Sequence, residues 1–200
     1  MMRGTDMKLF LASSIYIDSH HPQVAAKAAE LAAGCTSEHM LVTRCFEFVR
    51  DVIKHSLDFN LDPVTCRASD VLRHGSGYCY AKSHLLAALL RANGIAAGLC
   101  YQRRALGSQF CLHGLNAVYL QQYGWYRIDA RGNKPGIEAA FSPPLEKLAY
   151  LPLGVGEGDL PGILDQPLPA IVRALTGYAT VQEVADNLPD IELPAIPSIA

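Results

Sequence analysis

Residues 75–92 read GSGYCYAKSHLLAALLRA, a glycine-rich turn that leads directly into a helix-forming segment with Cys79 at the junction. The segment after the turn is rich in leucine and alanine and holds no glycine or proline, so its helix propensity is high. It is apolar around most of its circumference, which predicts a buried helix. Gly75 and Gly77 permit the sharp backbone turn before it.

Cys79 stands where this helix is expected to begin. Its thiol would lie at the positive end of the helix dipole, beside backbone N–H groups that have no partner within the helix. Both effects favour the thiolate, which is the nucleophilic form of cysteine, and the same N–H groups can hold an oxyanion. The alternative is a small buried residue, the common fate of a free cysteine. This stretch alone does not decide between the two.

Length and composition set wider limits. The chain has 200 residues, half of them apolar, which predicts one large domain or one domain with appendages. The net charge of -2 gives no electrostatic reason for nucleic-acid or membrane binding, and no apolar run approaches the ~20 residues of a membrane span. We therefore expect neither as a partner. Charged residues make up only 18% of the chain, and the apolar surface this allows is compatible with a homodimer.

The six cysteines are irregularly spaced and include no C-x-x-C pair. This pattern argues against a structural zinc site and for reduced thiols. The apolar segment at residues 9–12 is too short for a signal peptide. We expect a cytoplasmic protein with no cofactor and no metal.

The pattern of apolar and turn-forming residues predicts the order of elements. We expect a strand or extended segment at 8–17, helices from 22 and over 37–55, strands at 95–101, 111–120 and 124–130, a polar connection at 103–109, an edge strand at 145–151, a glycine-rich linker at 154–162, short helices at 170–175 and 181–188, and a Pro-rich arm at 189–200. Two parts follow. Residues 1–152 form the main domain, and residues 153–200 form a linker, short helices and arm packed on the same domain.

A hairpin between the second and third strands brings two polar residues together. His113 and Asp129 are both eight residues from Gln121, so a turn at Gln121 places them opposite each other. Cross-strand neighbours have Cβ atoms about 4.5–5.5 Å apart, within reach of an imidazole–carboxylate hydrogen bond. A turn shifted by one residue would make the contact diagonal.

A cysteine at a helix start, with His and Asp on adjacent strands, has the composition of a thiol triad. Asp129 lies in an otherwise apolar hairpin and needs a partner there, because an unpaired buried carboxylate is costly. A structural His113 is the alternative. A metal site made of Cys111, His113 and Asp129 is another, but it lacks the tight Cys/His pairing typical of zinc ligands.

Four features of the chain, in this order, resemble the transglutaminase-like superfamily, and most closely its bacterial stand-alone members. They are the Gly77-Tyr78-Cys79 turn that opens a helix, the segment LLAALLRANGI at 85–95, the strand His113, and the strand GWYRID at 124–129. The resemblance centres on residues 67–134. It is the combination that is specific, since each piece alone is common.

The resemblance implies an α+β fold with a papain/transglutaminase-like core, in which a Cys-bearing central helix packs on an antiparallel sheet that carries His and Asp. It implies Cys79 as nucleophile, His113 as general base and acid, and Asp129 as the residue that orients the imidazole. The implied activity is that of a cysteine-dependent hydrolase (peptidase or amidase) or an acyltransferase, acting on a peptide or protein amide through a thioester.

Several residues near this triad are candidates for substrate binding. Tyr78 and Tyr80 flank the cysteine, Lys82 lies one helical turn along, and Trp125 shares the Asp129 face of its strand. A second group could ring the cleft and favour acidic substrates, with solvated loops as the alternative: Arg103, Arg104, Arg131 and Lys134.

The function hypothesis from a different class is a catalytically inactive binding or scaffold domain that keeps the fold. The presence of Cys, His and Asp together favours the enzyme.

Overall fold

The computed structural model of the chain describes residues 4–193, with side chains from residue 7 onward. In chain order its elements are α1 (Gly4–Leu9), α2 (Pro22–Ala32), α3 (Glu38–Glu47), the π-helix η1 (Phe48–Val52), β1 (Lys54–His55), α4 (Ser56–Phe59), α5 (Ala68–His74), β2 (Ser76–Gly77), α6 (Cys79–Ala92), β3 (Ala97–Leu106), β4 (Gln109–Leu120), β5 (Gly124–Ile128), β6 (Gly158–Asp159), α7 (Pro169–Thr176) and α8 (Val181–Asp186).

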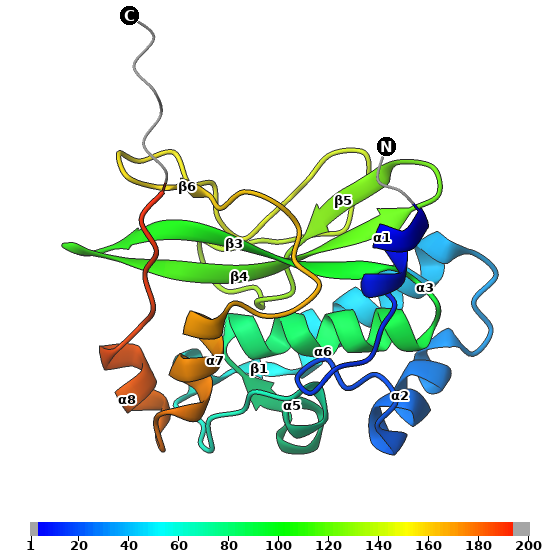
Figure 1. Ribbon diagram of the computed structural model, residues 1–200, viewed down its shortest axis with the longest axis horizontal. Helices are drawn as coiled ribbons and strands as arrows, with labels where there is room; N and C mark the ends of the chain where they lie inside the picture. Colours follow the sequence, from blue (N-terminus) through cyan, green and yellow to red (C-terminus); the bar gives the residue numbers. More distant parts are fainter. Residues whose placement is uncertain (1–3, 194–200) are drawn as a thin grey trace, which may run out of the picture.

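The architecture has two layers (Figure 1). One is an antiparallel sheet with strand order β5-β4-β3-β6, and the other is a group of helices centred on α6, which packs against β3 and β4. Helices α2, α3 and α5 surround the rest of α6. Every residue of α6 from Cys79 to Arg91 is buried, which confirms the prediction of a buried helix. Its leucines supply the core, at about 1.5–3 kcal/mol for each buried side chain.

The polar side chains of α6 are buried because they bind main-chain carbonyl groups of neighbouring segments. The imidazole Nδ1 of His84 lies 2.8 Å from the carbonyl oxygen of Cys66. Arg91 donates to the carbonyl oxygen of Ala97 at 3.0 and 2.8 Å and to that of Asp165 at 2.9 Å. These bonds replace water for groups that would otherwise be costly to bury, and they hold the first strand of the sheet against the helix.

The hairpin of β3 and β4 is longer than the sequence predicts. The strands pair without interruption from Ala97↔Val118 to Leu106↔Gln109, so the polar connection expected at residues 103–109 is wrong. The turn is instead the tight pair at 107–108, with Gly107 at a φ of 62° that favours glycine. The sequence pattern of the outer half of the hairpin resembles a loop because residues 103–110 are half-buried or exposed, and polar side chains are favourable on a strand there.

The N-terminal half differs from the predictions in two places. The segment predicted as a strand or extended segment at 8–17 begins inside α1 and continues without regular structure. The helix predicted over residues 37–55 begins as expected, with the Ser37 hydroxyl accepting a bond from the N–H of Met40 at 3.2 Å. It ends earlier, at Val52, because the chain turns into β1, where His55 pairs with Gly77 of β2.

The C-terminal segment packs against both layers. The expected edge strand at 145–151 reduces to one isolated bridge between Ala140 and Lys147. Residues 158–159, in the segment predicted as a glycine-rich linker, form β6 because their backbone groups pair with the free edge of β3. The segment after α8 forms no strand. Its Pro189 carbonyl oxygen nevertheless accepts a hydrogen bond from the Leu112 N–H of β4 at 2.8 Å. The rest of the predicted Pro-rich arm, residues 194–200, lies outside the described residues.

Within residues 4–193, no helix has the length and apolar character that crossing a membrane requires.

Candidate active site

Cys79 is the first residue of α6, and it opens into a cleft of about 330 Å³ between the helix start and the sheet. Tyr78 precedes it with an extended backbone (φ −61°, ψ 161°), so the helix begins abruptly at the cysteine. The parallel pairing of β1 with β2 fixes the turn just before it. The backbone N–H of Cys79 occupies the first helical position, where no intrahelical acceptor exists.

Strand β4 lies close against this helix start because residue 114 is a glycine. A Cβ atom at Gly114 would lie 2.9 Å from Cδ1 and 3.1 Å from Cα of Tyr80, closer than side chains normally pack. The close approach lets the Gly114 N–H donate to the Sγ atom of Cys79 at 3.5 Å. It also brings the preceding residue, His113, to the wall of the cleft.

His113 and Asp129 form a buried pair with 2.8 Å between Nε2 and Oδ2. The turn between β4 and β5 is one residue later than a turn at Gln121, because Leu120 pairs with Gly124. By extension of this register Asp129 faces Leu115, so its contact with His113 is the diagonal one, one of the two geometries the sequence allowed. Asp129 lies just beyond the last paired residue of β5, where its carboxylate turns toward the histidine.

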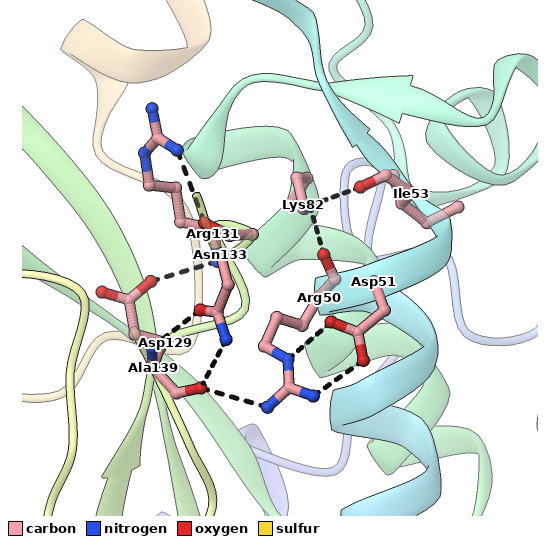
Figure 2. Close-up of polar contacts among 9 residues, drawn as sticks. Arg50, Asp51, Ile53, Lys82, Asp129, Arg131, Asn133 and Ala139 are labelled. Atoms are coloured by element: carbon pink, nitrogen blue, oxygen red, sulfur yellow. Dashed lines mark hydrogen bonds and ion pairs between the residues drawn. The ribbon is translucent and has the colours of Figure 1, made fainter. Parts of the chain in front are cut away.

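Two backbone groups complete the environment of Asp129. The N–H of Arg131 donates to Oδ1 and the N–H of Ala149 donates to Oδ2, both at 3.1 Å. Figure 2 shows the Arg131 contact. Burial by itself raises the pKa of Asp129, but the charge of His113 and these hydrogen bonds lower it below its ordinary value. The carboxylate is therefore ionised at neutral pH.

The pKa of His113 moves the other way. Burial by itself lowers it, whereas the charges of Asp129 and Cys79, and side-chain hydrogen bonds to both, raise it to about 9. Because Nε2 is bonded to Asp129, the nitrogen left for Cys79 is Nδ1. A protonated imidazole between a carboxylate and a thiol stabilises the thiolate, which is the arrangement that nucleophilic catalysis by cysteine needs.

The sequence model for the transglutaminase-like superfamily matches residues 25–130, which is more than half of the chain. This chain belongs to the transglutaminase-like superfamily. A search of curated proteins finds no match to it.

Two solved structures share the fold. One is a candidate cysteine protease from Cytophaga hutchinsonii, with a TM-score of 0.54 and 20% identity over 65% of this chain and 43% of that protein. The other is the periplasmic domain of TgpA from Pseudomonas aeruginosa bound to ethylmercury, with a TM-score of 0.50 and 19% identity over 64% of this chain and 49% of that one. The chain thus spans less than half the length of either. The expected α+β papain/transglutaminase-like fold is confirmed.

Tyr78 and Tyr80, two residues that the sequence proposes for substrate binding, line the cleft. Their hydroxyl groups are already used. That of Tyr78 donates to the Val181 carbonyl at 2.6 Å, and that of Tyr80 donates to the Leu112 carbonyl. Neither hydroxyl group is therefore free to bind another molecule, and Tyr78 also ties α8 to the start of α6.

Lys82 lies away from the cleft. It is fully buried, and its Nζ atom donates to the carbonyl oxygens of Ile53 and Arg50, as Figure 2 shows. Burial, together with the charge of Arg131, lowers its pKa to about 7. In this position Lys82 holds the end of η1 against α6.

Trp125 also lies away from the cleft. It pairs across the sheet with Tyr119 at the hairpin end, six residues along β4 from His113, a distance of roughly 20 Å on an extended strand. Its ring packs against Phe10 at a centroid distance of 4.9 Å. It shares the face of Asp129, as the alternation predicts, but cannot shield the His–Asp pair.

Three cleft residues have no signal in the local sequence: His55, Asp58 and Tyr150. The Tyr150 ring meets the edge of His113 at a centroid distance of 4.8 Å. The His55 ring meets that of Tyr78 at 5.6 Å, and burial lowers the pKa of His55 to about 3, so it is neutral. All three come from segments far from the motif and reach the cleft only through the fold.

Three of the four basic residues that the sequence names as cleft candidates line it: Arg104, Arg131 and Lys134. The fourth, Arg103, instead forms an ion pair with Asp190 at 2.6 Å. Among the described side chains, no group of three His, Cys, Asp or Glu residues has the spacing of a metal site. The metal alternative at Cys111, His113 and Asp129 therefore gains no support from the geometry.

Proposed function

We propose that the protein is a cysteine-dependent enzyme that acts on amide bonds, as a hydrolase or an acyltransferase. Cys79 is the nucleophile, His113 the general base and acid, and Asp129 the residue that orients the imidazole. One observation carries the proposal: a single buried imidazole, on a strand pressed against the helix start, hydrogen-bonds Asp129 and lines the same cleft as Cys79, whose Sγ atom accepts the N–H of the next residue on that strand, Gly114. A binding domain that had lost catalysis would have no need of this arrangement.

The chemistry follows from the geometry. The Cys79 thiolate attacks the amide carbonyl carbon, and a C–S bond forms. The imidazolium of His113 gives its proton to the departing nitrogen as the C–N bond breaks, which leaves a thioester. Water then gives a proton to His113 and adds to the carbonyl carbon. When the C–S bond breaks, the acid is released and the thiolate is restored. An amine in place of water forms a new amide, which is acyl transfer.

The oxyanion of each tetrahedral intermediate needs hydrogen-bond donors. The Cys79 N–H supports this role because it lies at the first position of α6, at the positive end of the helix. His55 is a further candidate. It lines the same cleft, pairs with the turn residue Gly77, and its Nδ1 has no hydrogen-bond partner among the described residues.

The decisive experiment is alkylation by iodoacetamide, followed at each cysteine by mass spectrometry from pH 5 to pH 9. We expect Cys79 to react faster than the partly exposed Cys35 near pH 6, and to lose this advantage in His113→Ala. Cys66 is a buried reference thiol whose pKa is raised to about 12 by burial. If Cys79 reacts no faster than Cys35, the nucleophile assignment fails and the binding-domain hypothesis takes its place.

A positive result leads to a screen of peptide and protein amides. Trapping a thioester on Cys79 by acid quench and mass spectrometry identifies substrates, and adding primary amines then separates the two outcomes. Hydrolysis gives the free acid at every amine concentration, whereas an acyltransferase gives a new amide in proportion to the amine.

The setting of the enzyme is also part of the proposal. We place it in the cytoplasm, because all six cysteines are free and a reducing compartment keeps them so. We assign catalysis to residues 1–152 and a supporting role to 153–200, whose residue Leu188 lines the cleft. A homodimer is testable by sedimentation velocity. Fractionation of cells that express the full chain tests the location.

A further inference from the structure

The cleft around Cys79 has a charge opposite to that of the whole chain. The protein carries 17 basic and 19 acidic residues, a net charge of -2. Yet three basic side chains, Arg104, Arg131 and Lys134, line this one cleft, and Asp58 is the single carboxylate among its lining residues. A cleft in which one sign of charge predominates attracts ligands of the other sign, because low-dielectric walls focus the field.

Two of the three cations share the one carboxylate. Arg131 binds both oxygens of Asp58 at 2.7 and 2.9 Å, and Lys134 binds one of them at 2.7 Å. Burial by itself raises the pKa of Asp58, but the hydrogen bonds from these two partners lower it to about 2. Asp58 is therefore ionised and fully engaged, and it has no capacity to neutralise Arg104.

Arg104 forms no hydrogen bond or ion pair within the described part of the chain. Its Cζ atom lies 3.2 Å from the ring centroid of Tyr150, so the guanidinium is held over the ring. The nearby carboxylate of Glu157 is occupied by the backbone N–H groups of Ala105 and Gly154, at 2.7 and 2.8 Å. An aromatic platform fixes such a cation while its N–H edge stays free to donate.

This free guanidinium lies next to the reacting groups. Arg104 pairs across the sheet with Cys111, two residues from His113 on β4. The ring beneath the guanidinium is the same Tyr150 ring that meets the edge of His113. One aromatic side chain thus separates the unsatisfied cation from the imidazole that would serve catalysis.

We infer that Arg104, supported by Tyr150, is a carboxylate-binding subsite, and that the substrate carries a carboxylate next to the amide bond attacked by Cys79. This inference rests on the proposed function and names its substrate class: peptides with an acidic side chain or a terminal carboxylate beside the cleaved bond. Arginine suits this task because its planar fork matches the two oxygens of a carboxylate.

The first test needs no amide substrate. Iodoacetate and iodoacetamide are nearly the same size, but only the first is an anion. We expect the ratio of their alkylation rates at Cys79, divided by the same ratio at Cys35, to fall about tenfold in Arg104→Gln, the loss typical of one charge-assisted hydrogen bond. Arg104→Lys, which keeps the charge and loses the fork, should retain part of the selectivity.

Arg103→Gln is the matched control, because it removes the same charge from the neighbouring residue of β3, whose guanidinium is paired with Asp190. It should leave the ratio within about twofold of wild type. Thermal unfolding of each variant checks that the fold is intact. An unchanged ratio in Arg104→Gln, or an equal fall in Arg103→Gln, would overturn the subsite.

The second test uses two peptides that differ only in Glu versus Gln beside the cleaved amide. We expect kcat/KM for the Glu peptide to exceed that for the Gln peptide by about tenfold in wild type, and the preference to vanish in Arg104→Gln. Cleavage of both peptides at equal rates would contradict the carboxylate subsite and support the proposed enzymatic activity. Charge-selective alkylation without cleavage of any amide would contradict the proposed activity and support the subsite.

Discussion

Replacing Asp129 by asparagine removes the charge that holds the proton on His113 while keeping the size of the side chain. In the wild-type protein the pKa of His113 rises from 6.5 to about 9. At about 1.4 kcal/mol for each tenfold change in proton affinity, this rise is worth about 3 kcal/mol of folding stability. The Asp129 carboxylate is the largest of the influences that raise the pKa of His113.

The sign of the pH dependence follows from the direction of each pKa change. A histidine whose pKa is higher in the folded chain contributes its full stabilisation below pH 6.5 and loses it as the pH rises through about 9. Asp129, whose pKa is lowered, contributes above its ordinary value of 3.8 and loses this as the pH falls below that value. The pair therefore stabilises the protein most between about pH 4 and pH 6.5.

We expect the difference in free energy of unfolding between wild type and Asp129→Asn to shrink by up to about 3 kcal/mol from pH 6 to pH 10. The assay is urea unfolding at a series of pH values, followed by the fluorescence of the single tryptophan and by circular dichroism. Glu30→Gln is the control, because Glu30 is an exposed carboxylate that pairs with Lys27. Its difference from wild type should not vary over this range.

A double-mutant cycle shows whether the effect passes through the histidine. In a His113→Gln background, Asp129→Asn should lose most of its pH dependence between pH 6 and pH 10. The remainder passes through Lys82, whose pKa the Asp129 charge raises, and should disappear when Lys82→Met is added. A difference that stays constant with pH in the wild-type background, or one that persists unchanged in His113→Gln, would refute the assignment of the shift to this pair.

Two further predictions concern the frame of the site. Gly114→Ala should slow the alkylation of Cys79 at least tenfold and destabilise the fold by about 1–3 kcal/mol. The reason is that the new methyl group overlaps Tyr80 and pushes β4 away from the helix start. Alkylation rates and urea unfolding curves measured on the same preparation show whether both effects occur. The free energy of unfolding of wild type minus that of Lys82→Met should rise between pH 7 and pH 10.5. Burial lowers the pKa of Lys82 to about 7, so protonation of this lysine destabilises the folded wild-type chain fully below pH 7 and not at all above pH 10.5. Urea unfolding across that range tests it, and a difference that stays constant with pH would contradict it.

The sequence predicts those parts of the site that lie on regular elements. Cys79 at a helix start is read from a glycine-rich turn followed by a helix-forming run. The meeting of His113 with Asp129 follows from strand alternation and hairpin register, and the one-residue shift of the turn changes the contact only from direct to diagonal. The placement of Trp125 shows the limit of this reasoning, because a shared face says nothing about the distance along a strand.

The sequence fails where position depends on contacts between distant segments. From the sequence, Lys82 is a helical lysine one turn from Cys79, but its ammonium group points to the carbonyl oxygens of Arg50 and Ile53 at the end of η1. The local pattern gives the angular position of Lys82 on its helix, but it does not show which segment packs against that side of the helix. His55 and Tyr150 reach the cleft from segments with little regular structure. The sequence of such segments has no period from which the direction of a side chain could be predicted.

By itself, then, the sequence determined the superfamily from the order of its motifs and the α+β class from its helix and strand patterns. These patterns act over a few residues and fix which side chains share a face, which is why Cys79, His113 and Asp129 are the residues proposed as nucleophile, base and orienting carboxylate. Only the tertiary structure decided that Arg104 is left without a counter-charge while Arg131 and Lys134 share Asp58. Charge pairing depends on which segments the fold brings within a few ångströms, and that distance is set by the packing of the whole chain rather than by any local pattern.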